Sequence, residues 1–153
     1  MYMFKLQPVL DHRQFVEDTL KKELAEIKHQ ASMARQQMAA LKKKENQTVN
    51  MMRQEQRQGL ASDQVVGYHA FLRQLAERII GQQRVIARIK AREVRKQGEL
   101  LDAMKNRQIM EKLRDQDFDR YNRTEQKKEM NFIDEIAVNQ YARKANSGIG
   151  DGE

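Results

Sequence analysis

Apolar residues recur every three or four positions on both sides of one short stretch, Gln58–Asp63. Such spacing is typical of a seam, the narrow apolar row through which a helix packs against one partner in a two-stranded coiled coil. The seam expected before the stretch consists of Val16, Leu20, Leu24, Ile27, Ala31, Ala34, Met38 and Leu41. The seam expected after it consists of Val65, Tyr68, Leu72, Leu75, Ile79, Ile86 and Ile89, with Gln82 in one skipped place. Beyond Ile89 we expect a shift of register, with the seam continuing through Val94, Leu101, Met104, Ile109 and Leu113.

The stretch between the two seams carries the signals of a turn. Gly59 stands where a helix C-cap uses a glycine, and Ser62 and Asp63 are residue types that cap the start of a helix. The sequence therefore predicts an all-α fold, a long antiparallel two-helix coiled coil with an overhanging second helix. The expected bounds are about 8–58 for the first helix, 58–63 for the turn and about 63–144 for the second helix.

Composition favours long helices that share a thin seam over a fold with a thick core. Apolar residues make up 39% of the 153 residues, aromatic residues 6% and charged residues 33%. A two-helix hairpin needs little apolar material, because each residue meets only one neighbouring helix. Cysteine is absent, which excludes disulfides and thiolate metal sites. No run approaches the roughly 20 apolar residues of a membrane span, and the first residues lack signal-peptide features, so we expect a cytoplasmic protein.

The second predicted helix is much longer than the first. Counting outward from the centre of the turn places Val9 opposite Leu113. Residues past Asp117 would then form an overhang, a part of the second helix that has no partner on the first. We expect one stalk over residues 1–146 and a flexible tail over residues 147–153.

No site of chemistry is indicated. The histidines His12, His29 and His69 are scattered without the spacing of metal ligands, and no phosphate loop, zinc-protease helix or nucleophile elbow occurs. Asp134 and Glu135 are adjacent carboxylates, but adjacent helix residues point about 100° apart and cannot act together as acid and base on one substrate. We therefore expect a protein that is not an enzyme and that holds no cofactor and no metal.

Two groups of residues are candidate binding surfaces. Phe71 lies about 70° away from the seam axis, beside Arg78 and Gln82, so one partner helix cannot bury it fully. This docking flank (Phe71, Arg78 and Gln82) either binds a partner or packs along the edge of the first helix. The overhang carries an apolar row that needs a cover, either a partner or the lead segment (residues 1–10) folded back onto it. The row consists of Phe118, Tyr121, Met130, Ile133, Ala137 and Tyr141.

The net charge of +7 leaves nucleic acid, an acidic membrane surface or an acidic protein as partners. A basic ridge on the second helix consists of Arg78, Arg84, Arg88, Lys90, Arg92, Arg95 and Lys96, with Lys42–Lys44 expected nearby. A solvated face explains such a ridge equally well. A nucleic-acid-binding coiled coil would use the ridge, although no aromatic residues interleave with it as stacking platforms. A self-assembling structural coiled coil, which pairs its seam with a second chain, is the other alternative.

The turn, the docking flank and the overhang resemble a known family. The similarity is carried by Gly59–Asp63, Tyr68, Phe71, Leu72, Leu75, Gln83–Arg84, Asn122–Lys128 and Asp134–Glu135. These stretches are similar to the FliJ proteins of flagellar type III export and, more distantly, to their injectisome counterparts. The family brings its Asp-Glu pair soon after Gln-Lys, whereas Glu129–Phe132 intervenes in this chain.

The resemblance implies a stalk. Proteins of that family are antiparallel two-helix coiled coils, similar to the shaft of rotary ATPases, that insert into the ring of the export ATPase and contact the export gate and substrate chaperones. For this chain it implies an ATPase-ring contact through Met130, Ile133, Ala137, Tyr141, Arg123, Lys127 and Lys128. It implies an export-gate contact through Phe71, Arg78 and Gln82. No nucleic acid is expected as a partner, and the chain by itself is expected to be a monomer, placed in the cytoplasm beside the inner membrane.

Overall fold

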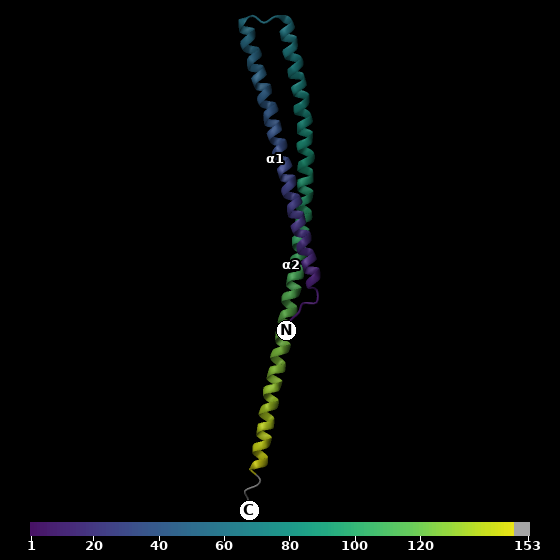
Figure 1. Ribbon diagram of the computed structural model, residues 1–153, viewed down its shortest axis with the longest axis vertical. Helices are drawn as coiled ribbons and strands as arrows, with labels where there is room; N and C mark the ends of the chain where they lie inside the picture. The colour runs from purple at the N-terminus through teal and green to yellow at the C-terminus, as the bar shows by residue number, and fades with distance from the viewer. Residues whose placement is uncertain (149–153) are drawn as a thin grey trace, which may run out of the picture. The chain divides into compact units, whose positions relative to one another are not determined.

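The structure is a computed structural model that describes residues 1–148. Within that range it contains two helices, α1 (Gln7–Gln58) and α2 (Ser62–Ser147), which pack against each other as an antiparallel hairpin (Figure 1). The predicted fold class is thereby confirmed. The predicted flexible tail begins at Ser147, which is the last residue of α2, and residues 149–153 of that tail lie outside the described residues.

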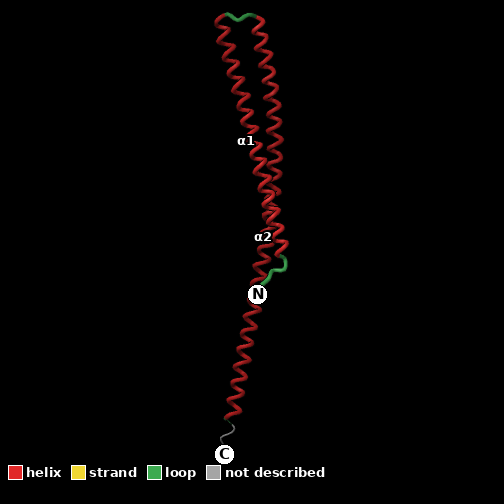
Figure 2. The backbone as a smooth tube through the Cα atoms, in the orientation of Figure 1, coloured by secondary structure: helices red, strands yellow, loops and turns green. Residues whose placement is uncertain are grey.

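The chain divides into two compact units. One comprises residues 15–104 and is called the hairpin unit below. The other comprises Met1–Gln14 and the part of α2 from Lys105 onward, and is called the terminal unit. In the hairpin unit the two helices run in opposite directions from the connecting loop, which Figure 2 shows in green.

Polar contacts between the helices fix the register of the hairpin unit. Lys96 Nζ lies 2.8 Å from Glu23 Oε2, and Arg92 Nη1 donates a hydrogen bond of 3.1 Å to Gln30 Oε1. These pairs advance along α1 as they retreat along α2, as an antiparallel coiled coil requires.

The core of the hairpin unit follows the predicted seam. Its buried apolar residues are Leu24, Ile27, Ala31, Ala34 and Met38 on α1, and Leu75 and Ala103 on α2. Leu75 is the most buried of them, with 1% of its surface exposed. No side chain between residues 39 and 74 is fully buried, so the end of the hairpin near the turn holds its helices together through half-buried contacts.

The prediction that Val16 is the first residue of the seam is wrong. Val16 is 37% exposed, whereas Glu17 is only 1% exposed and lies 3.2 Å from Lys21 Nζ. Counting three residues back from Leu20, instead of four, keeps the alternating gaps of a heptad and arrives at Glu17. The apolar side chain of Val16 was therefore a poorer guide than the heptad position itself.

The predicted shift of register in α2 is also wrong. Val94, Leu101 and Ile109 are 53–57% exposed, and the more buried positions continue without a break through Glu93, Lys96, Leu100 and Ala103. The prediction assigned apolar residues to the seam, whereas charged residues occupy the seam positions in this part of α2. Lys96 fills a seam position because its aliphatic stem is shielded while its ammonium group reaches Glu23.

The start of the turn is built as predicted. Gly59 has a φ of 89°, in the left-handed region that side chains with a Cβ rarely enter, and its N–H donates to the carbonyl of Gln56 at 3.3 Å. The glycine therefore ends α1 as a C-cap.

The start of α2 differs from the prediction. The carbonyl of Ala61 accepts hydrogen bonds from Gln64 N–H at 3.1 Å and Val65 N–H at 3.2 Å, so Ala61 occupies the N-cap. Ser62 and Asp63, which were expected to cap the helix, lie in its first turn instead. There the carboxylate of Asp63 interacts favourably with the positive end of the helix dipole.

In the terminal unit the lead segment packs on α2. Phe4 and Leu10 form a small buried cluster with Met110, and Tyr2 packs against it. The Tyr2 ring meets Phe118 edge-on with 5.0 Å between ring centroids, and the Tyr121 centroid lies 5.4 Å away. The folded-back lead therefore contacts Phe118, which stays 44% exposed, and Tyr121, in line with one of the two alternatives that the sequence left open for the apolar row.

Polar contacts hold Tyr2 in this place. Its hydroxyl lies 3.2 Å from the carbonyl oxygen of Arg114 and 3.1 Å from Asp117 Oδ2. Loss of solvent around the phenol and its hydrogen bond to the Asp117 carboxylate raise the pKa of Tyr2. Leu6 is 46% exposed, whereas Phe4 is 8% exposed. The lead is therefore anchored on α2 by Tyr2 and Phe4 and not by Leu6.

Candidate functional site

The docking flank is only partly free to bind a partner. Gln82 Nε2 donates to the carbonyl of Ala34 at 2.9 Å and to Gln37 Oε1 at 3.2 Å, so its amide is engaged between the helices. Phe71 is half-buried, and Arg78 is exposed one heptad further along α2. Phe71 and Arg78 thus lie on the same side of α2, whereas Gln82 belongs to the seam.

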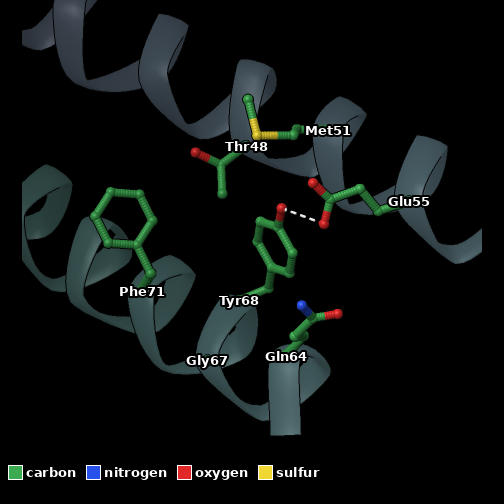
Figure 3. Close-up of a pocket in the computed structure, with 7 residues that line it drawn as sticks. All are labelled: Thr48, Met51, Glu55, Gln64, Gly67, Tyr68 and Phe71. Carbon is green, nitrogen blue, oxygen red and sulfur yellow. Dashed lines mark hydrogen bonds between the residues drawn. The ribbon is translucent and has the colours of Figure 1, made fainter. Parts of the chain in front are cut away.

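A groove of about 500 Å³ opens between the helices beside Phe71 (Figure 3). It is lined by Thr48, Met51 and Glu55 of α1 and by Gln64, Gly67, Tyr68 and Phe71 of α2. Tyr68 crosses it and donates a hydrogen bond of 2.7 Å to Glu55 Oε2. Lys44 Nζ lies 5.3 Å from the centroid of the Phe71 ring, within range of a cation–π contact.

The tie between Tyr68 and Glu55 should weaken at alkaline pH. The hydrogen bond to the Glu55 carboxylate, followed by burial, raises the pKa of Tyr68 above its ordinary value of 10.0. A pKa that is higher in the folded state than in the unfolded state gives a stabilisation that is complete below the unfolded pKa and is lost as the pH rises through the folded one. Urea midpoints measured from neutral pH to above the ordinary tyrosine pKa should therefore fall less steeply for Tyr68→Phe than for the unsubstituted chain. The matched Tyr141→Phe, at a position 78% exposed, should follow the unsubstituted chain, and identical curves for all three would contradict the tie.

The overhang is exposed along most of its length. Every described residue from Gln126 to Gly148 is exposed, including Met130, Ile133, Ala137 and Tyr141. The structure therefore places these four side chains in solvent. Phe132, Ile136 and Val138 are also exposed, and the sequence-based selection of one stripe left them out.

The basic residues of the overhang differ in how far they are engaged. Arg123 and Lys127 are exposed, whereas Lys128 Nζ lies 3.0 Å from Glu125 Oε1. This carboxylate raises the pKa of Lys128, so its ammonium group stays charged at any physiological pH. All three therefore present positive charge at the base of the exposed segment.

The basic ridge separates into two parts. Arg92 and Lys96 turn toward α1, where the Glu23 and Glu99 carboxylates hold Lys96 and raise its pKa. The other five residues of the ridge are exposed, namely Arg78, Arg84, Arg88, Lys90 and Arg95. Only the second part of the ridge is thus available to a partner.

Within residues 1–148, no group of three or more His, Cys, Asp or Glu side chains could hold a metal ion. None of the helices described there is long and apolar enough to cross a membrane. Asp134 and Glu135 both lie exposed on the overhang.

The family model of the flagellar FliJ protein matches residues 2–146. The chain belongs to the FliJ family. No curated protein and no solved structure was found to match the chain. The docking flank lies within the matched range, as do Met130, Ile133, Ala137 and Tyr141 of the overhang.

Membership in the FliJ family makes this chain a component of the flagellar export machinery, with a structural and not a catalytic role. The chain itself has the long hairpin with an unequal second helix that the sequence predicted from its seams. The contact that sequence reasoning missed in this FliJ protein is the tie between Tyr68 and Glu55. Its signal was present, since counting outward from the turn brings the two residues opposite each other.

Proposed function

We propose that the protein is a non-enzymatic stalk of the flagellar type III export apparatus, which inserts its overhang into the ring of the export ATPase and links that ring to the export gate and to chaperones. It would act in the cytoplasm, peripheral to the inner membrane, and as a monomer by itself. The observation that carries this proposal is the exposed apolar surface of the overhang. Six large apolar side chains between Met130 and Tyr141 are 41–78% exposed.

The distribution of these side chains around α2 supports an encircling partner. At 3.6 residues per turn, the arc from Phe132 through Ile133 to Val138 covers about 240° of the helix circumference. A single partner helix needs an apolar stripe of only about 100°. A ring pore, which surrounds the helix, would cover the wider arc.

The basic residues at the base of the overhang fit a guiding role. Lys127 and Lys128 precede Met130 by less than one turn, and Arg123 precedes it by about two turns. Surface charges of this kind affect the association rate and the register of a complex more than its affinity. Apolar contacts would hold the tip in the pore, and the cations would set its orientation.

A titration with the export ATPase tests the proposal. The full chain should join the assembled ATPase hexamer in size-exclusion chromatography and should raise its rate of ATP hydrolysis to saturation. A chain that forms a stable dimer and leaves hydrolysis unchanged would instead be a self-assembling coiled coil. Binding to random DNA that persists at physiological salt would support the nucleic-acid alternative and contradict the stalk.

The docking flank is proposed to contact the export gate through Phe71 and Arg78, with Gln82 holding the flank in place from the seam. Phe71→Ala should weaken binding to the soluble part of the gate protein while helicity and the melting temperature stay nearly unchanged. A pull-down and a thermal melt followed by circular dichroism measure both properties. Val66→Ala, at a residue 68% exposed near the turn, is the matched control. If Phe71→Ala lowers gate binding and the melting temperature together, Phe71 belongs to the fold and not to the gate contact.

A further inference from the structure

The hairpin unit has two flanks, because each helix carries one row of residues on either side of its seam. With Ile79 at a heptad a position, the seam residues occupy a and d, and the rows beside them are e and g. The g row of α1 includes Glu23, Gln30 and Gln37, and all three contact α2. Between Glu23 and Gln37 this flank is therefore closed by hydrogen bonds and an ion pair, and the e rows meet on the opposite flank.

The charged residues of the e flank are all cations. On α1 the e row consists of Lys21, Lys28, Arg35 and Lys42, and on α2 it consists of Ala76, Gln83, Lys90 and Gln97. Lys21 is paired with Glu17, whereas no ion pair is formed by the other four cations within residues 1–148. In the register set by the g flank, Lys28 lies opposite Lys90. Opposed like charges destabilise a coiled coil, so the packing of the hairpin itself does not explain them.

A second apolar row runs along α2 beside this flank. It consists of Ile80, Ala87, Val94 and Leu101, which repeat every seven residues at heptad position b. Ile80 is 51% exposed, Val94 56% and Leu101 53%. The row spans about 32 Å at 1.5 Å per residue.

Cations border the apolar row on both of its sides. The exposed Arg84, Arg88 and Arg95 lie on one side, and the e flank lies on the other. Three acidic residues of α2 lie near the row. Glu77 and Asp102 stand at its two ends, and Glu93, which precedes Val94, occupies a half-buried seam position. The middle of the surface is thus an apolar strip between two positive margins.

We infer that this surface binds an amphipathic helix of a partner protein that carries carboxylates on both sides of its apolar stripe. A repeat of seven residues matches the spacing at which a packed helix presents its side chains. A second copy of the chain does not fit, because it would bring its own arginines and lysines against the same cations. The inference uses only residues of the hairpin unit and does not depend on insertion of the overhang into a ring.

A designed peptide can serve as the probe. We would use a fluorescent peptide of about four heptads with Leu and Ile in its apolar stripe and Glu on both margins, and a second peptide with Lys in place of each Glu. Fluorescence anisotropy with the full chain should show saturable binding of the Glu peptide and none of the Lys peptide. Cross-linking should place the Glu peptide beside Lys28 or Lys90.

Two pairs of variants then separate this surface from general charge. Val94→Glu should weaken binding of the Glu peptide by about tenfold or more, whereas Val85→Glu, on the g flank, should change it little. Lys28→Glu combined with Arg35→Glu should have a similarly large effect. Lys22→Glu combined with Lys43→Glu removes the same charge from outward-facing positions and should have a small one. Circular dichroism should show unchanged helicity, and Val94→Ser replaces Val94→Glu if helicity falls.

Three results would overturn the inference. Equal loss of binding in both charge pairs would mean attraction by net charge alone. Equal binding of the Glu and Lys peptides would remove the argument from charge complementarity. Binding of phosphatidylglycerol vesicles but not of the Glu peptide, abolished by Val94→Glu, would assign the surface to a membrane.

Discussion

A chain carrying both Ile133→Asp and Tyr141→Asp should lose its stimulation of the export ATPase and keep its hairpin. Ile133 is 62% exposed and Tyr141 78% exposed, so neither side chain contributes packing that the fold would miss. In the proposed ring pore both would be buried in apolar surroundings, where an unpaired carboxylate is costly. We expect the apparent affinity for the ATPase to fall by at least about tenfold, measured as ATP hydrolysis over a range of chain concentrations.

The matched control for this experiment is Asn131→Asp combined with Asn139→Asp. It adds the same two negative charges to the same segment, at side chains that lie outside the apolar arc of the overhang. This control should stimulate the ATPase nearly as well as the unsubstituted chain, and both doubly substituted chains should show the same urea unfolding. If the Ile133 and Tyr141 variant stimulates hydrolysis at the same concentrations as the unsubstituted chain, the overhang is not the end that enters the ring.

The fold could be predicted from the sequence because a two-helix hairpin is encoded by local signals. The alternating gaps of the two seams and Gly59 at the end of α1 were sufficient for the architecture. The details failed where the prediction followed side-chain polarity in place of position. Glu17 and Lys96 occupy seam positions, since a long charged side chain can shield its stem in the seam and direct its charged group to a partner.

The candidate surfaces could be located from the sequence only in part. An exposed apolar row such as that of the overhang can be recognised from the sequence, because the predicted pairing of the helices leaves no residues of the first helix opposite it. Contacts that depend on how the lead folds back were not predictable in the same way. Tyr2 makes ring contacts with Phe118 and Tyr121, and no periodic pattern connects residue 2 with residues 118 and 121.

The heptad register also assigns several residues to rows other than those predicted from the sequence. Val94 and Leu101 were expected in the seam, and their exposure shows that they belong with Ile80 in a second row. The arginines that were considered as a single ridge divide between the closed g flank and the margin of that second row. One continuous register thus separates the contacts that hold the hairpin together from those left for a partner.

Leu75→Ala should cause a large loss of hairpin stability, about 2–5 kcal/mol of unfolding free energy, because truncating a buried leucine removes apolar contacts and leaves a cavity. Leu75 is 1% exposed and is the fully buried residue of α2 nearest to the turn. Urea unfolding followed by circular dichroism measures the loss. Ile80→Ala, five residues along the same helix, removes a side-chain volume similar to that removed by Leu75→Ala, but at a position that is 51% exposed. It should lower the unfolding free energy by well under half as much. Equal losses for the two substitutions would mean that the b row is packed as tightly as the seam, which would contradict both the register of α2 and the exposed second row derived from it.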